Sequence, residues 1–260
     1  MSKCVSKSIS KYIFYYIVII LIIIFVYLVL KSLIMEGLET DNVTVVSGYW
    51  KVKNKYNEET YKNWFKNSLN INQKYIFFCD NKDKEFIKEF RKYETEYIDY
   101  PLDNFYSKQF AKDEWVHPMH SPSKELAMIW NEKIHLIKLA KDRDPNPTEY
   151  YIWIDAGILQ YRDKSPPTVR LNINKELPKN KMYYSWVEDI ISGGVLIIHR
   201  DIIDEFHDKY YDILKNCNTG WECGIDQKIL RKMLDMYPNL FYKLSEGYGE
   251  NLIELYNYIG

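Results

Sequence analysis

The sequence has almost no net charge and few cysteines. Its 260 residues carry a formal charge of -1 at pH 7, so no basic surface is indicated and we expect no nucleic-acid partner. The four cysteines form no CxxC pair, which argues against a zinc knuckle or a thioredoxin-type site. For Cys217 and Cys223 two alternatives stay open, a local disulfide in an oxidising compartment or free buried thiols.

Two nucleotide-binding motifs are also absent. Neither GxGxxG nor GxxxxGK[ST] follows the first predicted strand (residues 43–50), which argues against a dinucleotide enzyme and a P-loop ATPase. What the chain does contain is 47% hydrophobic and 16% aromatic residues, enough for a sizeable core. The length after residue 41 suits one α/β domain.

An uncharged run of about nineteen residues, 12–30, is long enough to span a bilayer. A secretory signal would have a shorter apolar core and a small-residue cleavage site. Lys3, Lys7 and Lys11 precede the run and lysines are sparse just after it, so the positive-inside rule keeps the N-terminus cytoplasmic. We expect a single-pass type II membrane protein with four parts: a cytoplasmic tail (1–11), a transmembrane signal anchor in the lipid bilayer (12–30), a stem (31–41) and a lumenal or extracytoplasmic domain (42–260).

Strand and helix patterns alternate along this last part. The first strand is followed by a helix capped by Asn57, a second strand (74–79), a second amphipathic helix and a short third strand (96–100). This alternation predicts an α/β fold, with a mostly parallel sheet of Rossmann type flanked by helices. Residues 239–260 are expected to add a last strand and a helix.

An apolar stretch in the middle of the chain ends on a carboxylate. Residues 150–154 are aromatic or β-branched, as in a strand covered on both faces, and Asp155, Ala156 and Gly157 follow. Ligands of open α/β sheets bind at the carboxyl ends of the strands, which makes Asp155 a candidate ligand-binding residue. The alternative is a turn aspartate that caps the next loop.

A lysine lies in the apolar stripe of the helix predicted over residues 124–142. At 100° per residue, Lys133 falls in the middle of that stripe. It therefore extends its ammonium to solvent, pairs with an aspartate or meets a ligand phosphate. Asn131 and Glu132 are expected on the outer face.

Asp226 opens a later helix and is predicted to face inward, because Leu230 lies one turn further on the same side. Buried carboxylates are rare unless paired or used, although this one would also favour the helix N-terminus. Gly193 and Gly194 precede another apolar strand. Paired glycines there allow either a close approach of ligand or backbone, or a tight turn.

The order of these segments resembles the HtrL/YibB family, over roughly residues 42–251. The matching segments are Val-Thr-Val-Val-Ser-Gly-Tyr-Trp (43–50), Ile-Trp-Asn-Glu-Lys (129–133), Trp-Ile-Asp-Ala-Gly (153–157), Ser-Gly-Gly (192–194) and Asp-Gln (226–227). Members of this family are regarded as glycosyltransferases linked to polysaccharide biosynthesis, and the chain is more distantly similar to GT-A glycosyltransferases. The resemblance implies a GT-A-like catalytic domain over residues 42–260, with a nucleotide-sugar donor and a glycan or glycoconjugate acceptor.

The resemblance also implies roles for the matched residues. Asp155 would help to hold a divalent metal, Mn²⁺ or Mg²⁺, and the donor diphosphate, which Lys133 would also contact. Asp226 would be the catalytic carboxylate, as general base or as donor-sugar binder. The remaining matches would contact the nucleoside (Ser47 and Gly48) or line the donor sugar and acceptor (Ser192, Gly193, Gly194 and Gln227).

The chain departs from the GT-A pattern at two points. Gly157 replaces the second aspartate of Asp-x-Asp, and no histidine follows His207, although many GT-A enzymes have a late metal-binding histidine. Metal dependence is therefore open, with Asp163 or Asp189 as substitute ligands.

Two other functions stay open at this point. One is a catalytically inactive nucleotide- or glycan-binding protein on the same fold. The other is a metal-dependent phosphohydrolase that uses Asp155, Asp226 and the pair His117 and His120. Because Pro118 separates those histidines, a loop with two incidental histidines is the simpler interpretation of the pair.

Overall fold

The computed structural model describes residues 19–27, 42–173 and 176–257. The chain divides into two units, residues 1–41 and 42–260. In the first unit, residues 19–27 form a helix with exposed side chains. The predicted tail and stem, and the rest of the predicted anchor, lie outside the described residues. None of the described helices has both the length and the apolar character that crossing a membrane requires, so the anchor stays a prediction.

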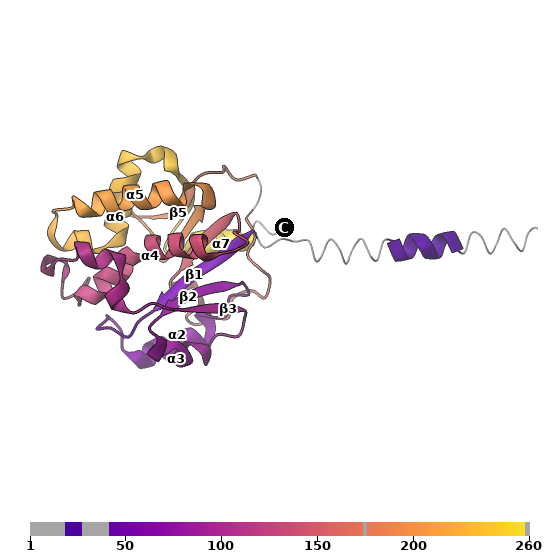
Figure 1. Cartoon of the computed structure of the whole chain (residues 1–260), viewed down its shortest axis with the longest axis horizontal. Coiled ribbons are helices and arrows are strands. Elements are labelled where there is room, and N and C mark those ends of the chain that lie inside the picture. Colours follow the sequence, from indigo (N-terminus) through magenta and orange to yellow (C-terminus); the bar gives the residue numbers. More distant parts are fainter. Residues whose placement is uncertain (1–18, 28–41, 174–175, 258–260) are drawn as a thin grey trace, which may run out of the picture. The chain divides into compact units, whose positions relative to one another are not determined.

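The second unit is built on an eight-stranded sheet with helices on both faces (Figure 1). The chain runs from β1 to β2 and β3 on one side, then returns to β4 on the other side of β1. The strand order therefore reverses between β1 and β4. In sheet order the strands are β3 (Thr95–Asp99), β2 (Tyr75–Cys79), β1 (Val43–Tyr49), β4 (Tyr150–Ile154), β7 (Val195–His199), β5 (Met182–Val187) and β6 (Ile190–Ile191), and β8 (Phe241–Glu246) pairs with β5.

The sheet is mixed rather than mostly parallel. Strands β3, β2, β1 and β4 are parallel, as predicted, whereas β7 runs antiparallel to β4 and β5. The cause is the connection before β7. Strands β5 and β6 form a hairpin through Glu188 and Asp189, and the chain continues through Ser192, Gly193 and Gly194 into β7 without a crossover helix, which a parallel strand would need.

Alternate side chains of the central strands enter two cores. In β4, Tyr151 and Trp153 join the core under three helices, and Ile152 and Ile154 join the core on the opposite face. The first face is covered by α4 (Lys124–Arg143), α5 (Ile203–Lys215) and α6 (Asp226–Met236), and the second by α2 (Glu58–Ser68), α3 (Lys84–Lys88) and α7 (Glu250–Asn257).

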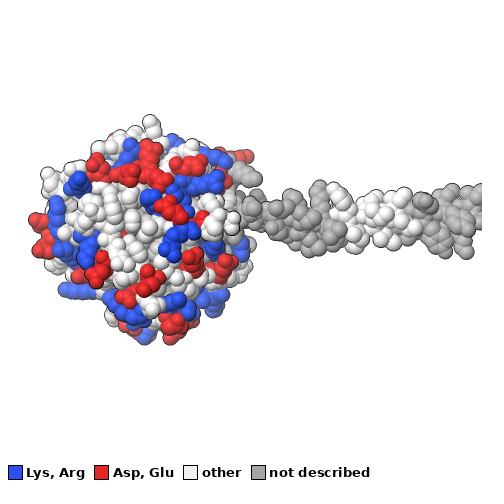
Figure 2. All heavy atoms as spheres, in the orientation of Figure 1, with Lys and Arg blue, Asp and Glu red and all other residues white. Residues whose placement is uncertain are grey.

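Several local predictions are confirmed. Asn57 caps α2, and its side chain accepts a hydrogen bond from the Thr60 amide at 2.9 Å. Strand β8 and helix α7 are the predicted last strand and helix. On the face drawn in Figure 2, acidic and basic side chains are interspersed. The expectation of no nucleic-acid partner stays a prediction.

The prediction for Asn131 and Glu132 is wrong, because both are fully buried. Glu132 accepts hydrogen bonds from the amides of Tyr106 at 2.8 Å and Ser107 at 2.7 Å. The Asn131 side chain accepts one from the Tyr210 hydroxyl at 2.8 Å. Helix α4 packs against α5 and the segment after β3 as well as against the sheet, and one apolar stripe does not reveal this.

Candidate functional site

Three charged side chains meet at the carboxyl end of β4. Asp155 directly follows this strand, Lys133 comes from α4, and Asp226 is the first residue of α6. The Nζ atom of Lys133 lies 3.1 Å from Oδ1 of Asp155 and 2.8 Å from Oδ2 of Asp226. It also donates a hydrogen bond to the Gly193 carbonyl at 2.8 Å. The ammonium group has three hydrogens, and three oxygens surround it.

Burial makes the charges of this trio depend on one another. Lys133 and Asp226 are only 3% and 5% exposed, whereas the Asp155 side chain is 41% exposed. Burial alone would lower the pKa of Lys133, but the charges of Asp155 and Asp226 outweigh it and raise this pKa. Burial raises the pKa of Asp226, and the nearby ammonium opposes this rise. Asp226 is therefore a buried carboxyl with increased proton affinity beside a fixed cation.

One indole side chain and two backbone hydrogen bonds hold the aspartates in place. Oδ1 of Asp155 accepts a hydrogen bond from Nε1 of Trp153 at 2.7 Å, and the Asp155 amide donates to the Gly194 carbonyl at 2.9 Å. Oδ1 of Asp226 accepts one from the Gln227 amide at 2.9 Å. The side-chain contacts of Asp155 involve Oδ1. No described residue donates a hydrogen bond to its Oδ2 atom, which is therefore available to a ligand.

Gly193 allows the close approach on which this arrangement depends. A Cβ atom at this position would lie 2.7 Å from Oδ2 of Asp226. Because β7 is antiparallel to β4, Val195 pairs with Ile154, and the preceding glycines therefore reach the carboxyl end of β4. Of the two alternatives for the paired glycines, Gly193 shows the close approach.

The trio forms part of the wall of a cavity of about 690 Å³. This volume is in the range of small-molecule sites. The cavity opens beside the ends of β1 and β4, where the strand order reverses and where open α/β sheets bind ligands. Its aromatic lining residues are Tyr56, Tyr61, Trp130, Trp221 and Tyr248, and its cationic ones are Lys55, Lys133, Arg162 and Lys228.

The other matched residues fall into two groups. Ser192, Gly193, Gly194 and Gln227 line the cavity, and Gly48 lines a smaller cavity of about 110 Å³ that shares Lys133 and Asp155 with it. Ser47 lines neither one. Its side chain is fully buried and donates a hydrogen bond to the Ile154 carbonyl at 2.7 Å, so it joins β1 to β4 instead of facing a nucleoside.

Sequence reasoning missed Lys55, Arg162 and most of the aromatic wall. From the sequence, Trp130 belongs to an apolar helix stripe, and Arg162 is an ordinary loop charge. In the fold, the Arg162 guanidinium lies 3.6 Å from the centre of the Trp64 ring, and its Nε donates to the Gly157 carbonyl at 2.9 Å. No local sequence signal marks these residues, since only the tertiary fold brings the segment after β1, helices α2 and α4 and the loop after β4 to one cavity.

The residues present do not fit a divalent-metal site. Asp189 lines the cavity and lies 3.8 Å from Nζ of Lys228, whereas Asp163 is exposed and does not line it. His120 is stacked on Trp221, with 4.9 Å between ring centres. Within residues 19–27, 42–173 and 176–257, no three His, Cys, Asp or Glu side chains are grouped to hold a metal ion. The phosphohydrolase alternative, which needs such a group, therefore gains no support.

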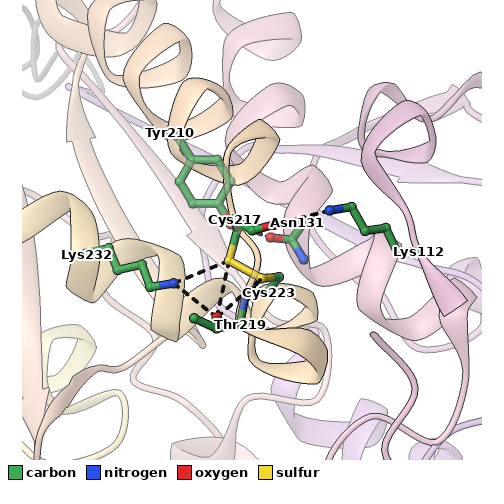
Figure 3. The surroundings of a disulfide bond; sticks show 7 residues. All are labelled: Lys112, Asn131, Tyr210, Cys217, Thr219, Cys223 and Lys232. Carbon is green, nitrogen blue, oxygen red and sulfur yellow. Dashed lines mark hydrogen bonds between the residues drawn. A yellow bond between two sulfur atoms is a disulfide. The ribbon is translucent and has the colours of Figure 1, made fainter. Parts of the chain in front are cut away.

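A disulfide joins Cys217 and Cys223 next to the site (Figure 3). The Thr219 amide donates a hydrogen bond to Sγ of Cys223 at 3.2 Å, and Nζ of Lys232 lies 3.3 Å from Sγ of Cys217. The closed loop contains Trp221 and ends shortly before Asp226. The disulfide therefore restrains one wall of the cavity.

No protein-family model matches this chain, and a sequence search of curated proteins found no significant match. Solved structures that are similar to it include the following three. Mouse xyloside xylosyltransferase 1 has 11% identity and a TM-score of 0.48, over 78% of this chain and 84% of that chain. The glycosyltransferase GlyE of Streptococcus pneumoniae TIGR4 has 12% identity and a TM-score of 0.38, over 77% of this chain and 44% of that one.

The third is 4-diphosphocytidyl-2C-methyl-D-erythritol synthase from Anaerococcus prevotii DSM 20548. It has 10% identity and a TM-score of 0.40, over 84% of this chain and 97% of that one. At these identities and scores the likeness carries no argument about activity, which has to come from the geometry of the site.

Proposed function

We propose that this chain is a glycosyltransferase of the GT-A type, which transfers a sugar from a nucleotide-sugar donor to a glycan or glycoconjugate acceptor. One observation carries the proposal. Lys133, Asp155 and Asp226, which come from three separate elements, surround one point at the reversal of strand order, in the wall of a cavity of about 690 Å³.

The lining of this cavity suits both ends of a nucleotide-sugar. Tyr56, Tyr61 and Trp130 offer aromatic surface on which a base or a sugar ring can stack. Cationic side chains are available to the diphosphate, whose charge grows as the sugar leaves. The free Oδ2 of Asp155 is an acceptor for a sugar hydroxyl.

Asp226 is the residue to which we assign the proton-accepting role. A general base works best when its pKa lies near the operating pH, and burial raises the pKa of Asp226 in that direction. Its neighbour Gln227 lines the same cavity and offers an amide to the acceptor.

The test is release of nucleoside diphosphate from a panel of UDP-, GDP-, ADP- and dTDP-sugars by the full-length chain, followed by chromatography. We expect release from at least one donor, and a loss of roughly 10²- to 10⁴-fold in Asp226→Asn, the usual contribution of a general base. Asp235→Asn, on the exposed side of the same helix, is the matched control. If no donor binds and none is cleaved, the proposal is refuted. Binding without release would favour the catalytically inactive alternative.

We also infer that residues 12–30 anchor the chain in a lipid bilayer, with residues 42–260 outside the cytoplasm. The uncharged run and the lysines before it support this orientation. The Cys217–Cys223 disulfide supports an oxidising compartment. We expect the full-length chain to stay with membranes during alkaline carbonate extraction, and a variant without residues 12–30 to be released. Release of the full-length chain would contradict the anchor.

A further inference from the structure

The geometry points to a donor site that binds its nucleoside diphosphate without a divalent metal ion, with Lys55, Lys133 and Arg162 supplying the positive charge. This inference rests on the proposed glycosyltransferase function and specifies the cofactor requirement and the diphosphate-binding residues of that site.

The first argument is that each carboxylate already has one oxygen paired with the Lys133 ammonium. Mg²⁺ and Mn²⁺ bind through several oxygen ligands, of which carboxylates supply the charge. Here the ammonium of Lys133 lies 3.1 Å from Asp155 and 2.8 Å from Asp226. Lys133 is only 3% exposed and cannot withdraw into solvent. A metal ion on these oxygens would lie beside the Lys133 ammonium, and the repulsion between the two positive charges would weaken its binding.

The second argument is that the space two residues after Asp155 is closed to another carboxylate. A Cβ atom at Gly157 would lie 3.0 Å from the Trp64 ring and 3.5 Å from the Tyr61 ring. The guanidinium of Arg162 covers the same Trp64 ring and binds the Gly157 carbonyl. A side chain at position 157 would therefore meet two aromatic rings, and the charged group bound to the Gly157 carbonyl is a cation.

The third argument is that two cations of the cavity have no carboxylate partner among the described residues. Among the described residues, no carboxylate lies within ion-pair distance of Lys55 or Arg162, although both side chains line the cavity. Nζ of Lys55 lies 5.2 Å from the centre of the Trp130 ring. Partial burial lowers the pKa of Lys55, and the charge of Asp226 partly opposes this. Guanidinium and ammonium groups with free donors are the usual protein ligands of phosphate oxygens.

The positions of the charges also suggest where the diphosphate lies. Arg162, Lys133 and Asp155 line the smaller cavity at the end of β1 as well as the main one. Glu188 and Asp189 come from the β5–β6 hairpin and line only the main cavity. The diphosphate is therefore expected near the end of β1. The hairpin side, where Lys228 lies 3.8 Å from Asp189, is left for the neutral sugar and acceptor.

The test is calorimetric binding of UDP, GDP, ADP and dTDP to the full-length chain, in EDTA and again with Mn²⁺ or Mg²⁺. We expect one diphosphate to bind with the same Kd in both buffers. Lys55→Gln and Arg162→Gln should each raise this Kd in EDTA about tenfold, the effect of one charge-assisted hydrogen bond. Lys53→Gln and Lys164→Gln, two residues away and exposed, are the matched controls and should leave the Kd unchanged.

The outcomes separate this inference from the proposed function. Binding only in the presence of Mn²⁺ or Mg²⁺ would overturn the inference and leave the glycosyltransferase proposal standing. No binding in either buffer would overturn both. Metal-independent binding that neither substitution weakens would overturn the assignment of Lys55 and Arg162. Because Arg162 also packs on Trp64, circular dichroism must show that Arg162→Gln is folded, and Lys55→Gln provides the independent test at an exposed position.

Discussion

Replacement of Lys133 by methionine tests whether its ammonium group supports the site electrostatically. Methionine keeps most of the side-chain volume but removes the charge within 3.1 Å of Asp155 and 2.8 Å of Asp226. Removal of one partner from a buried ion pair costs about 3–5 kcal/mol. Asp226 is 5% exposed and bears this cost in full, whereas the Asp155 side chain is 41% exposed and is screened by solvent. We therefore expect the free energy of unfolding to fall by about 3 kcal/mol at neutral pH, near the lower end of that range.

A double-mutant cycle with Asp226→Asn, measured by urea denaturation of the full-length chain, isolates the pair. In the Lys133→Met background, Asp226→Asn removes a charge that has lost its counter-ion. The double variant should therefore recover about 1–2 kcal/mol relative to Lys133→Met, within the usual range of coupling between contacting residues. If the loss in the double variant equals the sum of the two single losses, the electrostatic reasoning is refuted.

The deficit of Lys133→Met should also depend on pH. Burial already raises the pKa of Asp226, and loss of the ammonium raises it further. A carboxyl group whose pKa is higher in the folded state than in the unfolded state stabilises the fold at low pH, and this contribution is lost as pH rises through the folded pKa. The difference in unfolding free energy between wild type and Lys133→Met should therefore shrink as pH is lowered from neutral. A difference that stays constant would contradict this.

Two further predictions concern His135 in helix α4 and Gly193 beside the site. Burial lowers the pKa of His135, 3.1 Å from His207, from 6.5 to about 4, so the unfolded chain takes up this proton first as pH falls. The unfolding free energy should fall by about 2 kcal/mol between about pH 6.5 and 5, and urea titrations of His135→Gln should lack this loss. Gly193→Ala places a Cβ 2.7 Å from Oδ2 of Asp226 and should cost about 1–3 kcal/mol and weaken diphosphate binding. Wild-type stability and affinity in this variant would show that Gly193 is not needed for the close approach.

Local patterns were enough to predict several elements of this fold. The run of apolar residues before Asp155 marks β4, and the Asn57 cap marks the start of α2, because strand propensity and capping depend on neighbouring residues. Lys133 and Asp226 were recognised as inward-facing for the same kind of reason, since helical periodicity assigns each to an apolar side. Their roles in sugar transfer stay predictions.

Where periodicity was the only guide, it failed in ways that the packing explains. Asn131 and Glu132 lie away from the apolar stripe, yet both are buried, because α4 also packs on α5 and on the segment after β3. The direction of β7 was missed because a hairpin, and not a helix, leads into it. Ser47 matched a motif, but the alternation of side chains along β1 places it on the buried face with Val45, where its hydroxyl bonds the Ile154 carbonyl.

The sequence by itself determined most of the strands and helices, that Asp155 ends a buried strand, and that Lys133 and Asp226 face the interior. Only the tertiary structure decided that both aspartates contact the Lys133 ammonium and that the Gly193 carbonyl accepts its third hydrogen bond. It also decided that Lys55 and Arg162 line the same cavity. The physical reason is range. Helical and strand periodicity is set by neighbours along the chain, whereas contacts such as that between Lys133 and Gly193, 60 residues apart, depend on which elements pack together.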